Sequence, residues 1–144
     1  MKDSPLWLFR GKDLKTNQWA TGYLVVCESN MMSLPIDKRR PILCHFGRHG
    51  GNIYVTARHF VDFITLSLWT GFEDYSGNKI FHGDVVVRND TKKAYIVRWV
   101  ASSAGFRLWS NADRRYYEFG HNNPAKAFDI MGNIYDNPEL IDTI

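Results

Sequence analysis

Two cysteines and five histidines are the side chains of this chain best suited to metal binding or nucleophilic chemistry. Cys44, His45 and His49 lie close together in the sequence, with Cys27 and His59 within reach. Four such ligands could close a tetrahedral zinc site. The spacing contains no Cys-x-x-Cys pair, however, and the surrounding glycines disfavour a helix that would present both early histidines. We therefore predict no metal site and no cofactor, with both cysteines as buried small hydrophobic residues.

Two other patterns suggest chemistry on first sight. The segment RHGGN, residues 48–52, has the glycines of a phosphate-binding loop but not its Gly-Lys-Ser/Thr ending, and no convincing helix follows it. We interpret it as a hairpin tip. A cysteine could pair with a histidine in space, with Asp84 orienting the pair, but no local motif marks a nucleophile. We therefore expect a protein that is not an enzyme.

Basic residues interleaved with aromatic residues form the most serious functional pattern. The candidate binding surface consists of Arg98, Arg107, Trp109, Arg114, Arg115 and Tyr116, and a loop cluster adds Lys38, Arg39 and Arg40. Small β-barrels bind single-stranded nucleic acid by stacking bases on aromatic rings beside a basic groove. The alternative is a sheet face on which long cationic side chains lie over apolar neighbours. We expect Arg107 and Trp109 on opposite faces of one strand.

The charge of the chain weakens the nucleic-acid interpretation. Residues 1–72 carry nine basic and five acidic side chains, a net of +4, whereas residues 73–144 carry nine and ten, a net of −1. Acidic neighbours such as Asp113 and Glu118 dilute the candidate surface. A dedicated nucleic-acid binder is much more basic than this. Contacts with a protein partner, including a second copy of the chain, are therefore our first expectation, and nucleic acid is the second.

The segment WTGFEDYSGNKIFHGDVV, residues 69–86, is the densest group of turn residues. Gly71, Asp74, Gly77, Gly83 and Asp84 interrupt its apolar runs. Aspartate side chains bond nearby backbone amides, and glycine adopts a positive φ without steric cost. Turn chemistry thus explains every residue here, and Asp84 would accept backbone amide hydrogen bonds. A ligand role for Asp84 is the alternative, and we favour the structural one.

This segment and two others resemble the YopX family, proteins of bacterial phages and prophages whose biochemical activity is not established. The opening FRGKDLKTNQWATGYL, residues 9–24, is similar to the family's FRG, charged turn, Trp and Gly-aromatic strand. The closing MGNIYDNPELI, residues 131–141, is similar to its Gly-Asn-Ile and Asn-Pro-Glu-Leu ending. Departures occur at Phe72-Glu73 and Phe81-His82. The resemblance implies a phage-derived accessory protein and supplies no reaction.

Strand patterns dominate the elements that must position these residues. In the first half we expect strands over residues 6–10, ended by Gly11, and over residues 18–27, with Trp19, Thr21 and Tyr23 on one face. Short strands at 41–46 and 52–56 follow, then a helical turn over 57–63. In the second half we expect strands over 64–72, 84–88, 93–100, 105–109, 114–119 and 128–135, a short helix at 122–128 and a helical turn at 138–140.

These elements predict a mainly β, β-rich α+β protein. Residues 64–144 would form a small SH3-like barrel, whose closure removes exposed strand edges. Residues 1–63 would be a β-rich N-terminal lobe, and the two parts could equally be one continuous YopX-like domain over 1–144. No apolar run approaches about 20 residues, so we expect no membrane span. No secretory signal is visible, and we expect the cytoplasm of a bacterial host.

Overall fold

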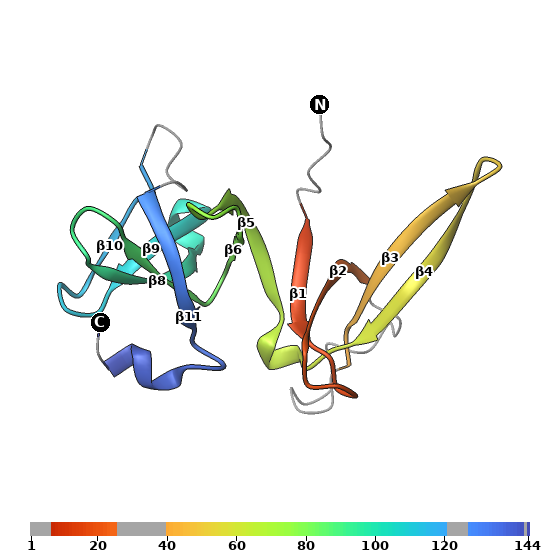
Figure 1. Cartoon of the computed structure of the whole chain (residues 1–144), viewed down its shortest axis with the longest axis horizontal. Coiled ribbons are helices and arrows are strands. Elements are labelled where there is room, and N and C mark those ends of the chain that lie inside the picture. Colours follow the sequence, from red (N-terminus) through yellow and green to blue (C-terminus); the bar gives the residue numbers. More distant parts are fainter. Residues whose placement is uncertain (1–6, 26–39, 121–126, 143) are drawn as a thin grey trace. The chain divides into compact units, whose positions relative to one another are not determined.

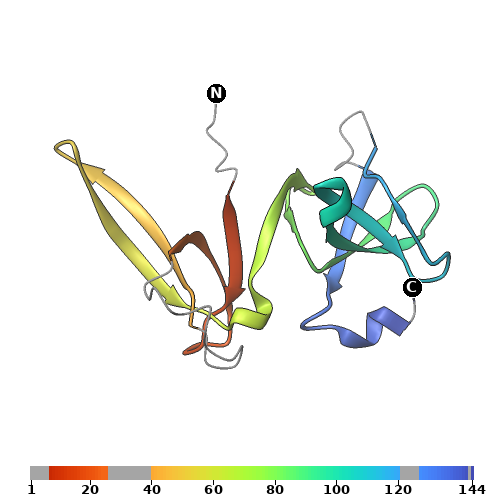
Figure 2. The same cartoon turned by 180° about the vertical axis from the view of Figure 1, so that it is seen from behind.

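The structure is a computed structural model that describes residues 7–25, 40–120, 127–142 and 144 (Figures 1 and 2). Antiparallel strands make up most of it, together with short 3-10 turns, so the expected mainly β class is confirmed. No helix among the described residues is long and apolar enough to cross a bilayer. The chain divides into two compact units, Met1–Leu68 and Trp69–Ile144. The division lies a few residues beyond the boundary expected at residue 63.

Unit 1 is an antiparallel sheet in the order β4-β3-β2-β1-β5. Its strands are β1 (Leu8–Lys12), β2 (Trp19–Val25), β3 (Ile42–His49), β4 (Asn52–Phe60) and the start of β5 (Ser67–Glu73), with the 3-10 turn η3 (Phe63–Thr65) before β5. A small core of Ala20, Leu43 and Val61 holds the sheet together, with Phe9, Leu24 and Leu66 packed around it.

Several strand ends in unit 1 differ from expectation, and two of the differences have a clear physical cause. The helical turn over residues 57–63 is wrong, since β4 continues to Phe60 and η3 begins only at Phe63. The alternating pairing of β4 with β3 extends along this whole stretch and overrides its local preference. Gly11 does not end the first strand but lies buried within β1. A Cβ at this position would be 2.9 Å from Cβ of Val61, so glycine permits close packing here.

Trp19, Thr21 and Tyr23 share one face of β2, and this face is the more exposed one. Ala20 and Gly22 are buried, whereas Thr21 and Tyr23 are exposed. Most of the predicted helix over residues 122–128 falls outside the described residues, as do Cys27, Lys38 and Arg39.

The β3–β4 hairpin is the longest element of unit 1. Its two strands meet at the turn Gly50-Gly51, where both glycines have a positive φ. The register shifts between His45 and Phe46, where β4 contains a bulge. The hairpin extends well beyond β1 and β2 (Figure 1, orange to yellow), so both faces of its outer half are open.

Unit 2 contains a five-stranded antiparallel sheet in the order β10-β9-β8-β7-β11. The strands are β7 (Asp84–Arg88), β8 (Ala94–Val100), β9 (Gly105–Ser110), β10 (Arg115–Tyr117) and β11 (Phe128–Asn133), with the 3-10 turns η4 (Ala101–Ser103) and η6 (Pro138–Asp142). The later part of β5 pairs with the short strand β6 (Lys79–Phe81). The strands expected in this half are therefore present, with ends shifted by at most three residues.

One face of the five-stranded sheet forms the core of unit 2, and β6 contributes to it. Its buried members are Ile80, Val86, Tyr95, Val97, Leu108, Phe119 and Phe128. The strand order has two ends, β10 and β11, so the described sheet is not closed and the barrel detail of the prediction is not confirmed. Ile96 of β8 and Val85 of β7, which pair with each other on the opposite face, are buried as well.

Candidate functional site

The signature turn around Asp74 is fastened to β11. Oδ1 of Asp74 accepts hydrogen bonds from the backbone amides of Ser76 (3.0 Å) and Asn78 (2.8 Å). Its Oδ2 accepts one from the Asn78 side chain (3.2 Å) and one from the Ile130 amide (3.4 Å). The next residue, Tyr75, donates its amide to the Phe128 carbonyl (2.9 Å). Both carboxylate oxygens of Asp74 are thus engaged inside the protein.

The environment of Asp74 changes its acidity. The side chain is buried, with the residue only 5% exposed, and burial by itself raises the pKa of the carboxyl group. The hydrogen bonds from Asn78, Ile130 and Ser76 outweigh this, so the pKa of Asp74 lies below its ordinary value. The folded protein therefore holds Asp74 as a carboxylate at neutral pH, and the charge stabilises the turn.

Gly83 and Asp84 form a second turn that hydrogen bonds hold to neighbouring segments. Gly83 has φ 85°, and Gly71 and Gly77 have φ 86° each, as turn chemistry predicts for glycine. The Gly83 amide donates to the Val97 carbonyl (2.8 Å), and its carbonyl accepts from the Ile134 amide (2.9 Å). Asp84 is buried, and its Oδ2 accepts from the Phe81 amide (2.8 Å).

The closing segment makes a turn of the same kind. Oδ1 of Asn133 accepts from the amides of Tyr135 (3.0 Å) and Asp136 (2.9 Å), and its Nδ2 donates to the Asp136 carboxylate (3.1 Å). A Cβ at Gly83 would lie 2.9 Å from the ring of Tyr135. The glycine of one signature segment and the tyrosine of another therefore contact each other.

The structure brings four of the six predicted surface residues together on one face. Since Val97 and Leu108 point into the core, their neighbours along β8 and β9 point outward. Arg98 lies opposite Arg107, and Trp109 lies opposite Tyr116. We call these four residues the ladder face. Arg107 and Trp109 share it, so the expectation that they occupy opposite faces is wrong, because residues two apart in a strand point the same way.

Three side chains of the ladder face lie in a row, in which the two aromatic rings are tilted by 59° to each other. The guanidinium of Arg98 lies 5.2 Å from the ring centre of Trp109, and that ring lies 4.9 Å from the ring of Tyr116. Arg107 instead donates a hydrogen bond to the Phe106 carbonyl (2.8 Å). Tyr116 is 43% exposed, so the end of the row is accessible to a flat ligand.

The other two predicted residues belong elsewhere. Arg114 lies in the turn before β10 with φ 54° and is exposed. Arg115 donates to the hydroxyl of Tyr117 (2.7 Å), which in turn donates to the Asp113 carboxylate (2.7 Å). The Tyr117 hydrogen bond comes first among the causes that lower the pKa of Asp113. Arg115 is the neighbour of Tyr116 along β10, so its side chain lies on the opposite face from the ladder face, where this network holds it.

The cysteine and histidine candidates of unit 1 do not converge. Cys44 is a buried free thiol, and Cys27 is outside the described residues. His45 and His59 meet edge to face at 6.3 Å, while His49 lies at the far end of β3. Among the described residues, no three or more Cys, His, Asp or Glu side chains are grouped so that they could hold a metal ion.

His59 instead makes a contact that the sequence did not reveal. Its Nδ1 lies 2.9 Å from Oδ2 of Asp13, whose Oδ1 accepts from the amides of Lys15 (2.8 Å) and Thr16 (3.1 Å). The hydrogen bond with His59 is the main cause that lowers the pKa of Asp13. Asp13 thereby ties the turn after β1 to the end of β4.

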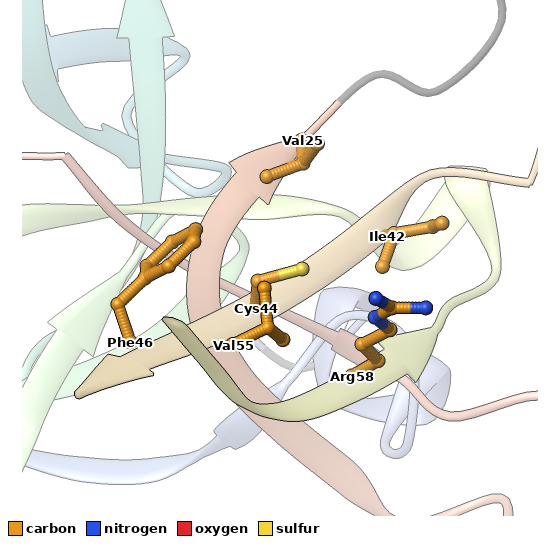
Figure 3. A pocket seen from close by; sticks show the side chains of 6 residues that line it. All are labelled: Val25, Ile42, Cys44, Phe46, Val55 and Arg58. Carbon is orange, nitrogen blue, oxygen red and sulfur yellow. The ribbon is translucent and has the colours of Figure 1, made fainter. Parts of the chain in front are cut away.

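The largest feature missed by sequence reasoning is a hollowed face on β2, β3 and β4. A cavity of about 240 Å³ is lined by Val25, Ile42, Cys44, Phe46, Val55 and Arg58. Phe46 lies at one end and Ile42 and Arg58 at the other, with Cys44 and Val55 between them (Figure 3). A second cavity of about 350 Å³, lined by Phe46, Gly47, Arg48 and Ile53, continues towards the hairpin tip. We call this the cavity face.

Comparison with known proteins identifies the lineage. The family described as YopX protein matches residues 8–142, which is nearly the whole chain. The chain belongs to the YopX family. It is also similar to a solved structure, the crystal structure of protein EF1440 from Enterococcus faecalis, with a TM-score of 0.61 and 19% identity over 96% of this chain and 99% of that one. That likeness shows a shared fold. No curated protein matches the sequence.

In this structure, the YopX segments quoted above largely form the turns and close contacts that hold the strands together. The turn of the central segment is held by Asp74, and that of the closing segment by Asn133. The opening segment contains Asp13 and the buried Gly11. The YopX match also spans the ladder face and the β3–β4 hairpin, so both candidate surfaces belong to the family region.

Proposed function

We propose that this YopX chain is a phage- or prophage-derived accessory protein of the bacterial cytoplasm, which acts by binding other proteins and not by catalysis. The β3–β4 hairpin carries this proposal. Its exposed side chains include large apolar residues that would normally be buried, namely Phe46, Ile53, Tyr54, Val55 and Phe60. Of these residues, Phe46, Ile53 and Val55 adjoin one another on one face of the hairpin, and an exposed apolar surface of this kind marks a protein contact site.

The charge of the hairpin supports a specific contact. Residues 42–60 contain Arg48 and Arg58 and no Asp or Glu, so they form an apolar surface with isolated positive charges. Interfaces of this composition, with aromatic residues and arginine at their centre, concentrate binding energy in a few side chains. The cavities of the cavity face offer recesses for apolar side chains of a partner.

An affinity capture from phage-infected host cells tests the proposal. The full chain and the double variant I53S/V55S would be compared, with Met131→Ser as the control, since Met131 is equally exposed but lies on β11. We expect the wild type and the Met131→Ser control to capture the same host protein, and the I53S/V55S variant not to capture it. Equal capture by all three proteins would contradict a role for the hairpin.

We also infer that unit 2 is an SH3-like barrel of the open kind. Its support is the packing of Ile80 from β6, with Phe72 from β5, on the core of the five-stranded sheet. Strands β5 and β6 would then cover the face that a closed barrel encloses. An experimental structure in which β5 and β6 leave this core would contradict the inference.

Single-stranded nucleic acid is the second candidate, and the ladder face favours it. Arg98 over Trp109 and the exposed Tyr116 resemble the stacking platforms on which bases lie beside a basic groove. We expect weak binding, because the net charge is only +3 and acidic residues lie nearby. Affinity would fall steeply as salt rises, since counterions are released on binding.

Fluorescence anisotropy with labelled oligothymidine measures the affinity for single-stranded nucleic acid directly. Trp109→Ala should cost about 1–3 kcal/mol of any binding that depends on stacking. Trp99→Ala is the control, because Trp99 is exposed on the opposite face of β8. Binding at about micromolar Kd in physiological salt, lost only in the Trp109 variant, would place nucleic acid above protein as the ligand.

A further inference from the structure

Strand β4 is an open sheet edge. It ends the strand order of unit 1, and β3 is its one strand neighbour among the described residues. Edge strands in soluble proteins are usually protected by proline, by lysine or by short length. β4 has nine residues, contains neither proline nor lysine, and carries a single permanent charge at Arg58. The bulge between Val55 and Ala57 also helps to protect an edge, but the rest of the β4 edge lacks such a device and can accept another strand.

Hydrogen bonds at one end show which backbone groups of β4 point away from β3. The Val61 amide donates to the Pro41 carbonyl (3.0 Å), whereas the Phe60 carbonyl points outward and accepts from the Leu14 amide (2.8 Å). Because the direction of backbone groups alternates along an antiparallel strand, the amide and carbonyl of Arg58 also point outward. The sheet edge is thus closed at Phe60 by Leu14 and open beyond it.

Beyond the bulge in β4, towards the hairpin tip, the alternation of inward and outward backbone groups is shifted by one residue. Asn52 and His49 flank the two-residue turn and face each other, so the outward positions in this half are Ile53 and Val55. Ile53 is 64% exposed and Val55 39% exposed. All outward backbone positions of β4 therefore carry side chains of the cavity face or its rim.

We propose that β4 pairs antiparallel with β4 of a second copy of this chain, about a two-fold axis between Thr56 and Ala57. This names the partner of the hairpin and so rests on the proposed function. The register places Val55 opposite Arg58 of the second copy, and the pairing stops short of Phe60, whose carbonyl already accepts from the Leu14 amide. Both residues of each central pair have outward backbone groups, so the two edges satisfy each other. A two-fold pairing of this type is closed and leaves no further edge on β4.

The charges of the hairpin are compatible with this register. The two Arg58 side chains lie three residues apart along the paired strands, which corresponds to a separation of about 11 Å. This exceeds the Debye length of about 8 Å at physiological ionic strength, so their repulsion is screened. No Asp or Glu is present in residues 42–60 to be left unpaired in the interface. The cavity faces of the two copies become one continuous apolar surface.

Sedimentation equilibrium of the full chain over a hundredfold concentration range tests the pairing. In Val55→Pro the outward amide is removed without loss of a hydrogen bond to β3. Val55→Thr is the matched control, since it keeps the amide and the β-branched shape. We expect the wild type and Val55→Thr to form dimers, and Val55→Pro to dissociate with a Kd at least about tenfold higher. A wild type that stays monomeric, or a Val55→Pro variant that dimerises as well as the control, overturns the inference.

Hydrogen exchange covers the case in which Val55→Pro fails to fold. In the wild type, the amides of Val55 and Arg58 should gain protection as protein concentration rises, while that of the inward Tyr54 should not change. Equal protection at all concentrations overturns the pairing. A monomeric wild type whose captured host protein is lost in I53S/V55S would overturn this inference and leave the proposed function standing.

Discussion

At the residue scale, Gly83 shows how one position serves both backbone geometry and packing. It combines φ 85° with the ring of Tyr135 close to where a Cβ would lie. Gly77 has φ 86° but nothing within 4 Å of that point. The two glycines therefore separate the cost of the backbone conformation from the cost of a side-chain collision.

Gly83→Val should lower the free energy of unfolding by about 1–3 kcal/mol, near the upper end of this range. Gly77→Val should lose only roughly 1 kcal/mol, because only backbone strain applies there. Urea unfolding of both variants measures the difference. Equal losses would show that Tyr135 moves aside at no cost.

Asp74 stabilises its turn as a charged group. Asp74→Asn should lower the free energy of unfolding by about 2–3 kcal/mol at pH 7, because an amide nitrogen would face the donors of Asn78 and Ile130. Since the folded pKa is below the ordinary value of about 4, the stabilisation is present above that pH and is lost as pH falls through the folded pKa. Urea unfolding between pH 7 and pH 3 should show a smaller pH dependence in the variant. Asp142→Asn, at an exposed site, is the control.

At the element scale, the Asp13–His59 contact joins the turn after β1 to β4. Asp13→Ala should speed hydrogen exchange in residues 14–17 and at the end of β4, since three hydrogen bonds are lost. The pKa of Asp13 is lowered, so in the wild type this protection should persist above about pH 4 and fade below it.

Asp90→Ala provides the matched control for Asp13. Asp90 also accepts from a turn amide, that of Thr91, and binds Arg88, but both of these partners lie within two residues of it. The Asp90→Ala substitution should change amide hydrogen exchange only in the β7–β8 turn. Unchanged exchange at the end of β4 in Asp13→Ala would show that His59 is not needed to hold that strand.

The elements also show what a sequence pattern can and cannot predict. The strands of unit 2 were predictable because turn residues and alternating apolar residues mark both ends of each one. The stretch from Ala57 to Phe60 was not, since its strand form depends on pairing with β3. Gly11 was misread for the same reason, because the Val61 side chain that excludes a Cβ lies 50 residues away.

The candidate sites also divide into features that local sequence patterns predict and features that depend on contacts between distant residues. The glycines of the signature turn were readable from local chemistry, and their positive φ angles are confirmed. The ladder face was found in part, since Arg115 lies on the opposite face of β10 from Tyr116, beside Tyr117. The cavity face was missed, because its lining comes from three strands whose register no local pattern reveals.

At the scale of the whole molecule, the scattered cysteines and histidines lead to a prediction about the metal content of the protein. Purified protein should carry no stoichiometric zinc, since the spacing of these residues lacks a ligand pair. Elemental analysis of protein purified without chelator measures this. About one zinc ion per chain, lost in Cys44→Ala, would contradict the prediction.

Strand β5 belongs to both units. Its first residues pair with β1, as Ser67 opposite Arg10 and Leu68 opposite Phe9, and its later residues pair with β6, as Trp69 opposite Phe81. The boundary between the units is therefore not a linker but the middle of a hydrogen-bonded strand. Limited proteolysis should find no early cut there, and a fragment beginning at Trp69 would lack the strand residues that precede it. Dissection of this chain into separately expressed pieces therefore requires that both pieces contain the whole of β5.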